Sequence, residues 1–493
     1  MKAALFRGIF LIFSLFILCG CNPTPQLSSN DIKHSPTQGA LANQQVEYNV
    51  RLPLIKNGSE LTPTPFLPVK STPVVTPTPL VFPASEVQTN TLRPDSAPVT
   101  PIPEPMPLLG DQANEEGDLI NVLLIGADRG SGSIFRTDTL IIASIRPRQQ
   151  IVTLISIPRD LFVYIPGWTM QRINTAYLHG QMIKYPGGGV ALLKDTIRYN
   201  LGIRIDHFAL VDFNGFKKIV DSLGGIDLPL VCPYTDWRVI NPNGDLENPD
   251  NWRLYTVGAG LVHMDGDMAL WYARSRLRSN DFDRGRRQQE TLRAIYQKAL
   301  HLNIIPRLPD LYAQIEGSVR SDIGLNEVLA LAPMALKLDA PRIRSYYISS
   351  KYVKGWWTPQ GAYVLLPKRE KVEQMLQEAM SPPDRQTEAR LSVLVEVCNR
   401  SKKAGAEVLA AERLHYAGYE TKIVPSEAET VSETYMIDYT GGQQPEMLAF
   451  LLKYLGLSAS RVHLSDYPGD QAAFRLVLGE DYDPCFNPAK INR

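Results

Sequence analysis

The sequence predicts an α/β protein with two folded parts: an α-β-α layered domain around a mixed or antiparallel sheet, and a smaller α/β domain behind it. Three apolar, β-branched segments joined by short connections predict consecutive strands, at Ile120–Gly126, Thr139–Arg146 and Ile151–Ile157. Apolar residues occupy both faces of each segment, so we expect helices to cover the sheet on both sides. After residue 390 a strand-helix-strand pattern begins again and indicates the second domain.

The first 20 residues have the pattern of an export signal. Lys2 and Arg7 precede an apolar run, Gly8–Leu18, that is too short to span a bilayer comfortably. The following Leu-Cys-Gly-Cys resembles a bacterial lipobox, which implies a lipoprotein with a lipid-modified Cys21. We therefore expect an extracytoplasmic protein anchored to the cell membrane, with a single N-terminal transmembrane anchor as the alternative.

Residues 21–117 form a Pro- and Thr-rich segment that predicts a disordered tether. It contains the repeats TPTPFLP and TPVVTPTPLVFP, and it holds much of the chain's total of 38 Pro. Such a composition buries too little apolar surface to fold and favours extended polyproline II, which acts as a semi-rigid spacer.

An arginine-rich stretch between Tyr272 and Gln289 indicates an anion site. Guanidinium groups are permanent cations whose planar fork matches phosphate oxygens. A strand over Trp271–Arg276 would place alternate residues on one face, and a helix from Arg284 would align residues at i, i+3 and i+4. These faces carry Arg274 and Arg276 on the strand, and Arg284, Arg287 and Gln288 on the helix. Arg278 and Arg286 fall off these faces, and we expect them in solvent or in salt bridges with Asp281 and Asp283. The alternative is that the whole stretch is a solvated, self-paired charge cluster.

A second set of charged residues falls at the ends of the three predicted strands. If the strands pair as an antiparallel meander, one edge of the sheet carries Asp128, Arg129, Arg136, Asp138, Arg159 and Asp160. Two carboxylates facing each other across a hairpin mouth repel unless a cation lies between them. Asp128 and Asp138 would thus suit Mg²⁺, which is bound through one or two carboxylates and substrate phosphates. The alternative is that Asp128 caps the loop and Asp138 pairs with a neighbouring arginine.

Seven motifs, in order along residues 118–300, resemble the LytR-CpsA-Psr family of cell-wall polymer ligases. They are NVLLIGADR, FRTDTLIIASI, LISIPRDLFVYIPG, RINTAY, IDHFALVDFNGFKKIVDSLGGID, MDGDMALWYARSR and DFDRGRRQQE. The resemblance implies a phosphotransferase of cell wall biogenesis. Such an enzyme takes a glycopolymer from a polyprenyl-pyrophosphate carrier and joins it to peptidoglycan through a phosphodiester bond. It places the catalytic domain at residues 118–300, and we expect residues 301–385 to be its helical extension.

The resemblance also assigns roles to residues of this chain. It implies Mg²⁺ at Asp128 and Asp138, and pyrophosphate at Arg159, Arg274, Arg276, Arg284 and Arg287, with Gln288 and Arg136 as further candidates. Arg159, Asp138 and Asp160 are the expected catalytic residues, and either aspartate would serve as the base that deprotonates the acceptor hydroxyl. Arg172 stands where relatives often have Lys before Ile-Asn-x-x-Tyr. A lipid tunnel is implied near Phe208, Leu210, Val211, Phe213 and Phe216.

The last domain, residues 390–484, is similar to the C-terminal LytR-type domain that follows many of these catalytic domains. It carries no catalytic constellation. Of the five Cys, Cys19 is expected to leave with the signal and Cys21 to be modified. Cys398 in this domain and Cys485 at its end are the expected disulfide pair, with free buried thiols as the alternative.

Two other functions compete with the ligase. One is a pyrophosphatase that acts on the same carrier with water as the acceptor, and the other is a non-catalytic receptor for lipid-linked glycans that regulates wall assembly. The chain has only 7 His, and none pairs with a nucleophile in a motif. Lys and Arg number 51 against 51 Asp and Glu, which lacks the basic excess of nucleic-acid binders. The aspartates favour an enzyme, because a receptor would need only the arginines.

Overall fold

A computed structural model describes residues 102–109, 119–127, 137–241, 244–245, 247–276, 281–302, 319–329, 331–425, 429–465 and 472–485. The predicted signal, Cys21 and almost all of the tether lie outside the described residues, as do Asp128 and Arg136. Within the described part, every helix is too short or too polar to cross a lipid bilayer.

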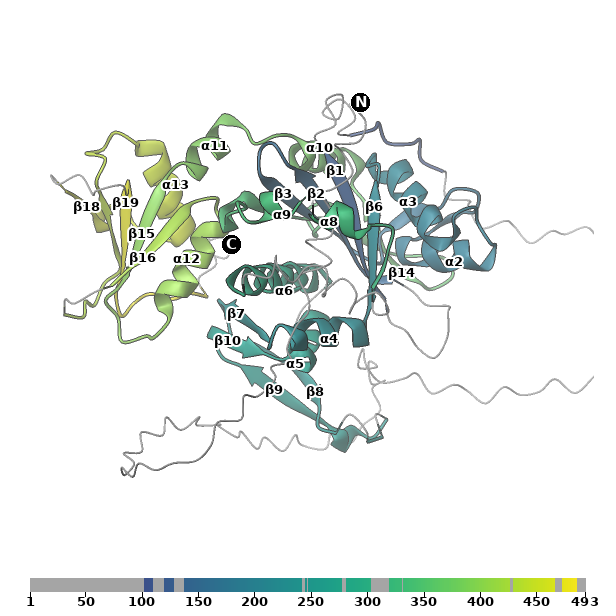
Figure 1. Ribbon diagram of the computed structural model, residues 1–493, viewed down its shortest axis with the longest axis horizontal. Coiled ribbons are helices and arrows are strands. Elements are labelled where there is room, and N and C mark those ends of the chain that lie inside the picture. Colours follow the sequence, from purple (N-terminus) through teal and green to yellow (C-terminus); the bar gives the residue numbers. More distant parts are fainter. Residues whose placement is uncertain are drawn as a thin grey trace, which may run out of the picture. The chain divides into compact units, whose positions relative to one another are not determined.

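A six-stranded mixed sheet forms the centre of the first folded part of the chain (Figure 1). Its order is β11-β6-β1-β2-β3-β12, and the strands are β1 (Ile120–Ala127), β2 (Thr137–Arg146), β3 (Ile151–Ile157), β6 (His207–Asp212), β11 (Val319–Ser321) and β12 (Ile343–Tyr347). The predicted meander is confirmed, since β2 pairs antiparallel with both β1 and β3. Parallel pairing of β6 with β1 and of β12 with β3 makes the sheet mixed.

The pairing of β1 with β2 contains a bulge at the end of β1 and the start of β2. Gly126 pairs with Thr139 and Ala127 pairs with Thr137, so Asp138 between them has no partner on β1. A bulge of this kind bends the strand and changes the direction of a side chain. Asp138 therefore lies outside the regular pairing that its neighbours Thr137 and Thr139 make with β1.

One face of the sheet is covered by α4 (Phe213–Ser222), α5 (Gly266–Arg274) and the long α6 (Asp281–His301). These helices share a core with the strands that includes Ile141, Ala209 and Ile295. Further elements on this side are β7 (Ile226–Leu230), β10 (Gly260–Met264), α8 (Leu325–Leu329) and α9 (Ala332–Ala335). The ribbon of β8 (Tyr234–Val239) and β9 (Trp252–Val257), with the turn Pro249–Asn251, follows β7.

The prediction of a short strand over Trp271–Arg276 is wrong, because α5 continues through Arg274. Asp265 caps the helix by accepting a hydrogen bond from the Met268 N–H at 2.8 Å. The buried residues Met268, Ala269, Tyr272 and Ala273 recur at helical spacing. Arg276 follows the helix, so Arg274 and Arg276 are not strand neighbours on one face.

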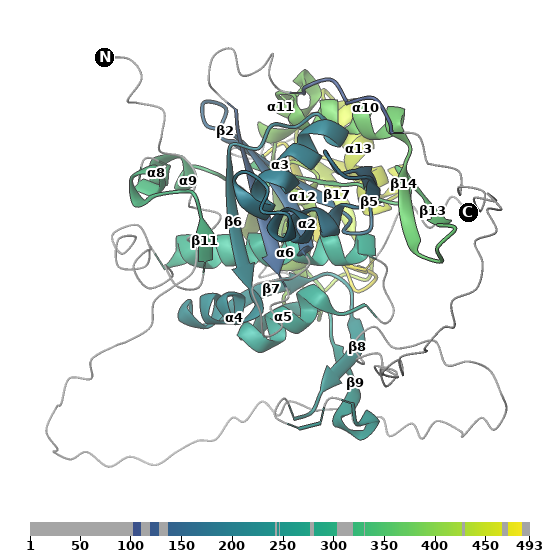
Figure 2. The same cartoon turned by 90° about the vertical axis from the view of Figure 1, so that its right-hand side faces the viewer.

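The other face is covered by α2 (Ala176–Met182), α3 (Gly188–Leu201) and α10 (Arg369–Met380). Two short hairpins lie on the same side: β4 (Phe162–Tyr164) with β5 (Met170–Arg172), and β13 (Val353–Trp357) with β14 (Tyr363–Pro367). The turns Ile173–Thr175 and Ala340–Arg342 complete the region. Figure 2 shows the β13–β14 hairpin extending outward. The stretch expected as a helical extension thus supplies strands as well as helices.

A second, five-stranded sheet forms the C-terminal part after α11 (Arg385–Leu391). Its order is β16-β15-β19-β17-β18, with β15 (Leu394–Asn399), β16 (Glu420–Val424), β17 (Tyr435–Asp438), β18 (Val462–Leu464) and β19 (Phe474–Leu478). The helices are α12 (Ala406–Tyr416) and α13 (Pro445–Leu455), with a turn at Ala459–Arg461. This agrees with the small α/β domain that the sequence predicts.

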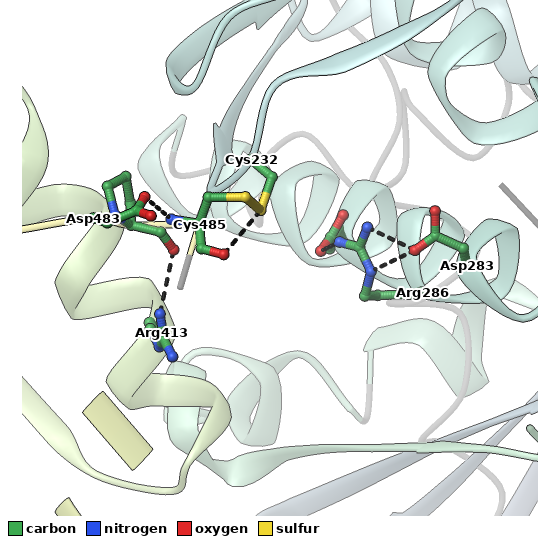
Figure 3. The surroundings of a disulfide bond; sticks show 8 residues. Cys232, Asp283, Arg286, Arg413, Asp483 and Cys485 are labelled. Carbon is green, nitrogen blue, oxygen red and sulfur yellow. Dashed lines mark hydrogen bonds and ion pairs between the residues drawn. A yellow bond between two sulfur atoms is a disulfide. The ribbon is translucent and has the colours of Figure 1, made fainter. Parts of the chain in front are cut away.

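The disulfide joins the two parts of the chain. Cys232, just after β7, is bonded to Cys485 near the C-terminus (Figure 3). Cys398 is a buried free thiol. The predicted Cys398–Cys485 pair is therefore wrong. Cys398 lies in β15, an inner strand of the second sheet. Cys485 instead follows the last strand, next to Pro484, whose carbonyl accepts a hydrogen bond from Arg413 of α12 at 3.3 Å.

Candidate active site

Arg159, which follows β3, lies at the centre of a cluster of charged side chains beyond the C-terminal end of that strand. Its Nη1 donates to Oδ1 of Asp138 at 2.6 Å, and its Nε lies 3.6 Å from Asp160 and 4.0 Å from Asp281. The carboxylate of the next residue and two from other parts of the chain thus surround one guanidinium, and they hold the pKa of Arg159 above its ordinary value despite burial.

Asp281, the first residue of α6, connects Arg159 to two further arginines. Its Oδ1 lies 3.0 Å from Nη1 of Arg276 and 3.5 Å from Nη2 of Arg284. Burial favours the neutral acid, but Arg284, Arg159 and Arg276 outweigh it and lower the pKa of Asp281. From the sequence, we expect Asp281 only in salt bridges with Arg278 or Arg286. Carboxylates are favoured in the first turn of a helix, so a helix start at Asp281 could have indicated a structural role for this residue.

Replacing Asp281 with Asn is expected to lower the free energy of unfolding at pH 7 by about 1–3 kcal/mol, because Arg159, Arg276 and Arg284 lose a carboxylate that they share. The folded-state pKa of Asp281 is depressed, so this stabilisation is complete above the unfolded pKa of about 4 and declines as pH falls below it. Urea unfolding between pH 7 and pH 3 measures the difference. The matched control is Asp283→Asn, whose carboxylate is 36% exposed and pairs with Arg286. A gap between native and Asp281→Asn that stays constant with pH would contradict the assignment.

Among the described residues, this cluster holds more positive than negative charge. In that part of the chain, the guanidiniums of Arg159, Arg172, Arg276 and Arg284 meet the carboxylates of three aspartates, Asp138, Asp160 and Asp281. Burial, together with Arg276 and Arg159, lowers the pKa of Arg284 to about 10, which still leaves it cationic at neutral pH. An anion bound here would relieve that excess.

Buried N–H donors without hydrogen-bond partners also indicate an anion site. Among the described residues, the buried Nε–H groups of Arg159, Arg276 and Arg284 have no hydrogen-bond partner. A buried donor without a partner costs about 1–3 kcal/mol. Phosphate oxygens are acceptors for which the guanidinium fork is well suited.

Arg287 occupies a different position from the one its helix spacing suggests. It is fully buried, and its guanidinium donates to the carbonyl groups of Tyr272 and Ser275 and lies 4.3 Å from the ring centre of Tyr234. These contacts fix the end of α5, from which Arg274 and Arg276 project. We therefore describe Arg287 as a positioning residue and not as part of the carboxylate cluster.

The change Arg287→Met is expected to lower the free energy of unfolding by about 2–4 kcal/mol, because it leaves two buried carbonyl groups without donors. Chemical denaturation measures this loss. The control is Arg286→Met, which removes ion pairs of a guanidinium that is 44% exposed and is expected to cost less than about 1 kcal/mol. If Arg287→Met instead left stability unchanged and weakened the binding of inorganic pyrophosphate, Arg287 would contact the ligand directly. The positioning role would then be wrong.

An apolar cavity of about 130 Å³ lies beside the cluster, between the sheet and α4, α5 and α6. Val211, Phe213 and Phe216 line it as expected, whereas Phe208 and Leu210 pack on the other face of the sheet. Further lining residues are Leu124, Ile141, Ala209, Ile219, Leu292 and Ile295. Arg274 also lines the cavity and stacks 3.6 Å from the ring centre of Phe213.

Gln288 connects the cavity to the charged cluster. Its side chain borders the apolar cavity and also a small polar pocket lined by Asp138, Asp281 and Arg284. Its Nε2 donates to the Thr139 hydroxyl at 2.8 Å and to the Ala273 carbonyl at 3.3 Å. Thus Arg284 and Gln288, one helical turn apart on α6, face the site together.

Asp160 and Arg172 form the side of the cluster nearest the hairpins. Arg172, on β5, lies 3.6 Å from Asp160. Burial raises the pKa of Asp160, and Asp281 adds to the effect, while Arg159 and Arg172 oppose it. Asp160 is therefore a better proton acceptor than an ordinary aspartate.

The fit of Mg²⁺ depends on the donors present. Within the described ranges, no group of three or more His, Cys, Asp or Glu side chains is arranged to hold a metal ion. Mg²⁺ commonly uses one or two carboxylates and completes its shell with phosphate and water. Asp138, placed on the bulge at 25% side-chain exposure, supplies a carboxylate of the required type.

Several known proteins resemble part of this chain. The TagU polyisoprenyl-teichoic acid–peptidoglycan teichoic acid transferase of Enterococcus faecalis is 29% identical over 218 residues, which is 43% of this chain and 64% of that protein. The protein of the same name from Bacillus subtilis is 28% identical over 42% of this chain and 60% of its own length. The regulatory protein MsrR of Staphylococcus aureus is 29% identical over 41% of this chain and 56% of its own length. The chain thus spans less than two thirds of each of these relatives.

Among solved structures, B. subtilis TagV matches 54% of this chain and 99% of its own, with 26% identity and a TM-score of 0.44. Residues 97–381 match the model of the LytR_cpsA_psr family. This match covers more than half of the sequence, and the chain therefore belongs to the LytR_cpsA_psr family.

Proposed function

We propose that this protein transfers a glycopolymer from a polyprenyl-pyrophosphate carrier to peptidoglycan through a phosphodiester bond. The observation that carries the proposal is the meeting, at Gln288, of an apolar cavity and a cationic cluster with unsatisfied donors. A prenyl pyrophosphate has the same two parts in the same order, an apolar chain followed by a diphosphate. The names of the relatives from E. faecalis and B. subtilis, which are teichoic acid transferases, support the same class of substrate.

The reaction is a phosphoryl transfer. A sugar hydroxyl of the acceptor attacks the phosphorus that carries the glycopolymer, a new P–O bond forms, and the bond from that phosphorus to the bridging oxygen breaks. Polyprenyl phosphate leaves, and the hydroxyl proton passes to a base. Such a step requires mainly positioning and stabilisation of charge on the phosphoryl oxygens. Arg159, Arg276 and Arg284 would supply this stabilisation.

Asp160 is the base that we favour over Asp138. Burial raises the pKa of Asp160 and makes it a better proton acceptor than an ordinary aspartate. Asp138 is instead held by Arg159 at 2.6 Å and lies on the bulge. Asp138, with Asp128 outside the described residues, would hold Mg²⁺, which when bound neutralises charge on the diphosphate.

The N-terminus supports action at the outer side of the cell membrane. The export signal and the Leu-Cys-Gly-Cys sequence would place a lipid anchor on Cys21. Both proposed substrates, a lipid-linked polymer and the wall, are found in that compartment.

Reconstitution tests the proposed function. The full-length chain in detergent is incubated with Mg²⁺, a synthetic polyprenyl-pyrophosphate glycan and peptidoglycan oligomers, with EDTA in a parallel sample. We expect a phosphodiester-linked product by mass spectrometry, and its loss in EDTA. Release of glycan phosphate without coupling would indicate the pyrophosphatase. Tight donor binding with no turnover would indicate the receptor, and either result would refute the transferase.

A further inference from the structure

Two aromatic side chains are exposed at the end of the β13–β14 hairpin. Trp357 is 66% exposed and Tyr363 is 44% exposed, and their ring centres lie 5.4 Å apart in an edge-on arrangement. Large aromatic side chains gain most when an apolar partner covers them, and exposed groups of this kind mark binding sites.

The hairpin is attached directly to the charged cluster. The Leu365 N–H donates to the carbonyl oxygen of Asp160 at 2.9 Å, and Nε of Arg172 donates to the carbonyl oxygen of Tyr363 at 3.2 Å. Leu365 forms a parallel bridge with Leu161, which places Tyr363, two residues earlier, level with Arg159. The aromatic pair therefore lies at the rim of the candidate active site.

The backbone allows the Tyr363 side chain to lie across the hairpin. Gly355 is positioned so that an added Cβ would come within 2.3 Å of the Tyr363 hydroxyl oxygen. Trp357 and Tyr363 pair directly across the two strands, so both side chains leave the same face. The result is a small aromatic surface with a fixed orientation.

This surface and the apolar cavity lie on opposite sides of the central sheet. The cavity is lined by Leu124 and Ile141, which share a core with α4, α5 and α6. The hairpin packs through Val353 and Leu365 into the core of the other face. In phosphoryl transfer the attacking and leaving oxygens are roughly in line. With the prenyl chain in the cavity, the acceptor hydroxyl must approach from the hairpin side.

We propose that Trp357 and Tyr363 bind the saccharide rings of the acceptor, a peptidoglycan glycan strand. This inference rests on the proposed transferase function and names the acceptor subsite of that reaction. A pyranose ring presents an apolar face of C–H groups that packs on an aromatic ring, while its hydroxyl groups remain in water. The backbone carbonyl of Asp160, the favoured base, accepts a hydrogen bond from this same hairpin, so the base and the aromatic surface are directly connected.

Binding of muramidase-released peptidoglycan tetrasaccharide tests the surface directly. Calorimetry on the full-length chain is expected to show about a tenfold rise in Kd for Trp357→Ala and for Tyr363→Ala, the effect of losing one stacked ring. The matched control is Trp168→Ala, which removes a tryptophan that is 41% exposed on the β4–β5 turn. An unchanged Kd in both hairpin variants overturns the proposal.

Kinetic measurements distinguish failure of the proposed acceptor site from failure of the proposed transferase function. In the reconstituted reaction, Trp357→Ala should raise KM for the acceptor about tenfold and leave the Kd for donor unchanged. Weaker donor binding would place the donor glycan on the surface instead, and weaker binding to phosphatidylglycerol vesicles would make it a membrane contact; either result overturns the proposal. If the native chain binds the tetrasaccharide through Trp357 but forms no phosphodiester, the transferase fails while the glycan site stands.

Discussion

The change Arg159→Ala is expected to reduce the rate of phosphodiester formation at least about 100-fold, the usual effect of losing one strong electrostatic contact to a transition state. Arg159 lies at the centre of the cluster, within 4.0 Å of three carboxylates, and its Nε–H is among the unsatisfied donors of the described residues. Single-turnover measurements with saturating donor isolate the chemical step. Asp138→Ala, which removes the nearest carboxylate and the proposed Mg²⁺ ligand, should give a loss of similar size.

The control for this experiment is Arg148→Ala. Arg148 is an exposed arginine in the turn between β2 and β3, at the end of the sheet opposite Arg159. Its removal should leave turnover within about twofold, because an exposed charge at that distance is screened by solvent and salt. Unchanged turnover in both Arg159→Ala and Asp138→Ala would refute the assignment of this cluster as the active site.

Removing the disulfide is expected to lower the free energy of unfolding by about 2–5 kcal/mol. Cys232 and Cys485 are separated by 253 residues, so the bond closes a very long loop and restricts the unfolded chain strongly. The bond also ties the end of the C-terminal part to the loop after β7. Chemical denaturation of Cys232→Ser against the native protein, with and without a reductant, measures the effect.

The thiol that is free serves as the control for the disulfide. Cys398→Ala keeps the Cys232–Cys485 bond and should remain sensitive to reductant, whereas Cys232→Ser should be insensitive. Non-reducing peptide mapping identifies the linked residues independently. A peptide linking Cys398 to Cys485 would show that the pairing in the structure is incorrect.

A buried ion pair also joins the two parts. Nε of Arg293 on α6 lies 3.5 Å from Oε1 of Glu412 on α12, and both side chains are almost fully buried. Arg293 also donates to the carbonyl groups of Ile343 and Ala340 at 2.7 and 3.0 Å. Hydrogen-bonding of the remaining donors is what allows such a charge to be buried. The disulfide is thus one of several contacts that hold the C-terminal part in place.

Local sequence patterns were sufficient for the strands that carry the site. Apolar β-branched runs with short connections determined β1, β2 and β3 and their antiparallel order, because hairpin pairing depends on neighbouring residues. That order brings Asp138, Arg159 and Asp160 to one edge, and the ion pairs between them follow from it. The same reasoning failed for Trp271–Arg276, where the Asp265 cap and the helical spacing of buried residues outweigh the alternation of two arginines.

By itself, the sequence determined which residue types are available, their order along the chain, and the membership of the LytR_cpsA_psr family. Only the tertiary structure decided which arginines meet the carboxylates. Arg284 and Gln288 face the cluster, whereas Arg287 is buried against Tyr234 and Tyr272, because the angle at which α6 packs on α5 sets the role of each face. The partner of Cys485 and the position of the aromatic hairpin beside Asp160 likewise depend on contacts between segments far apart in sequence, which no local pattern specifies.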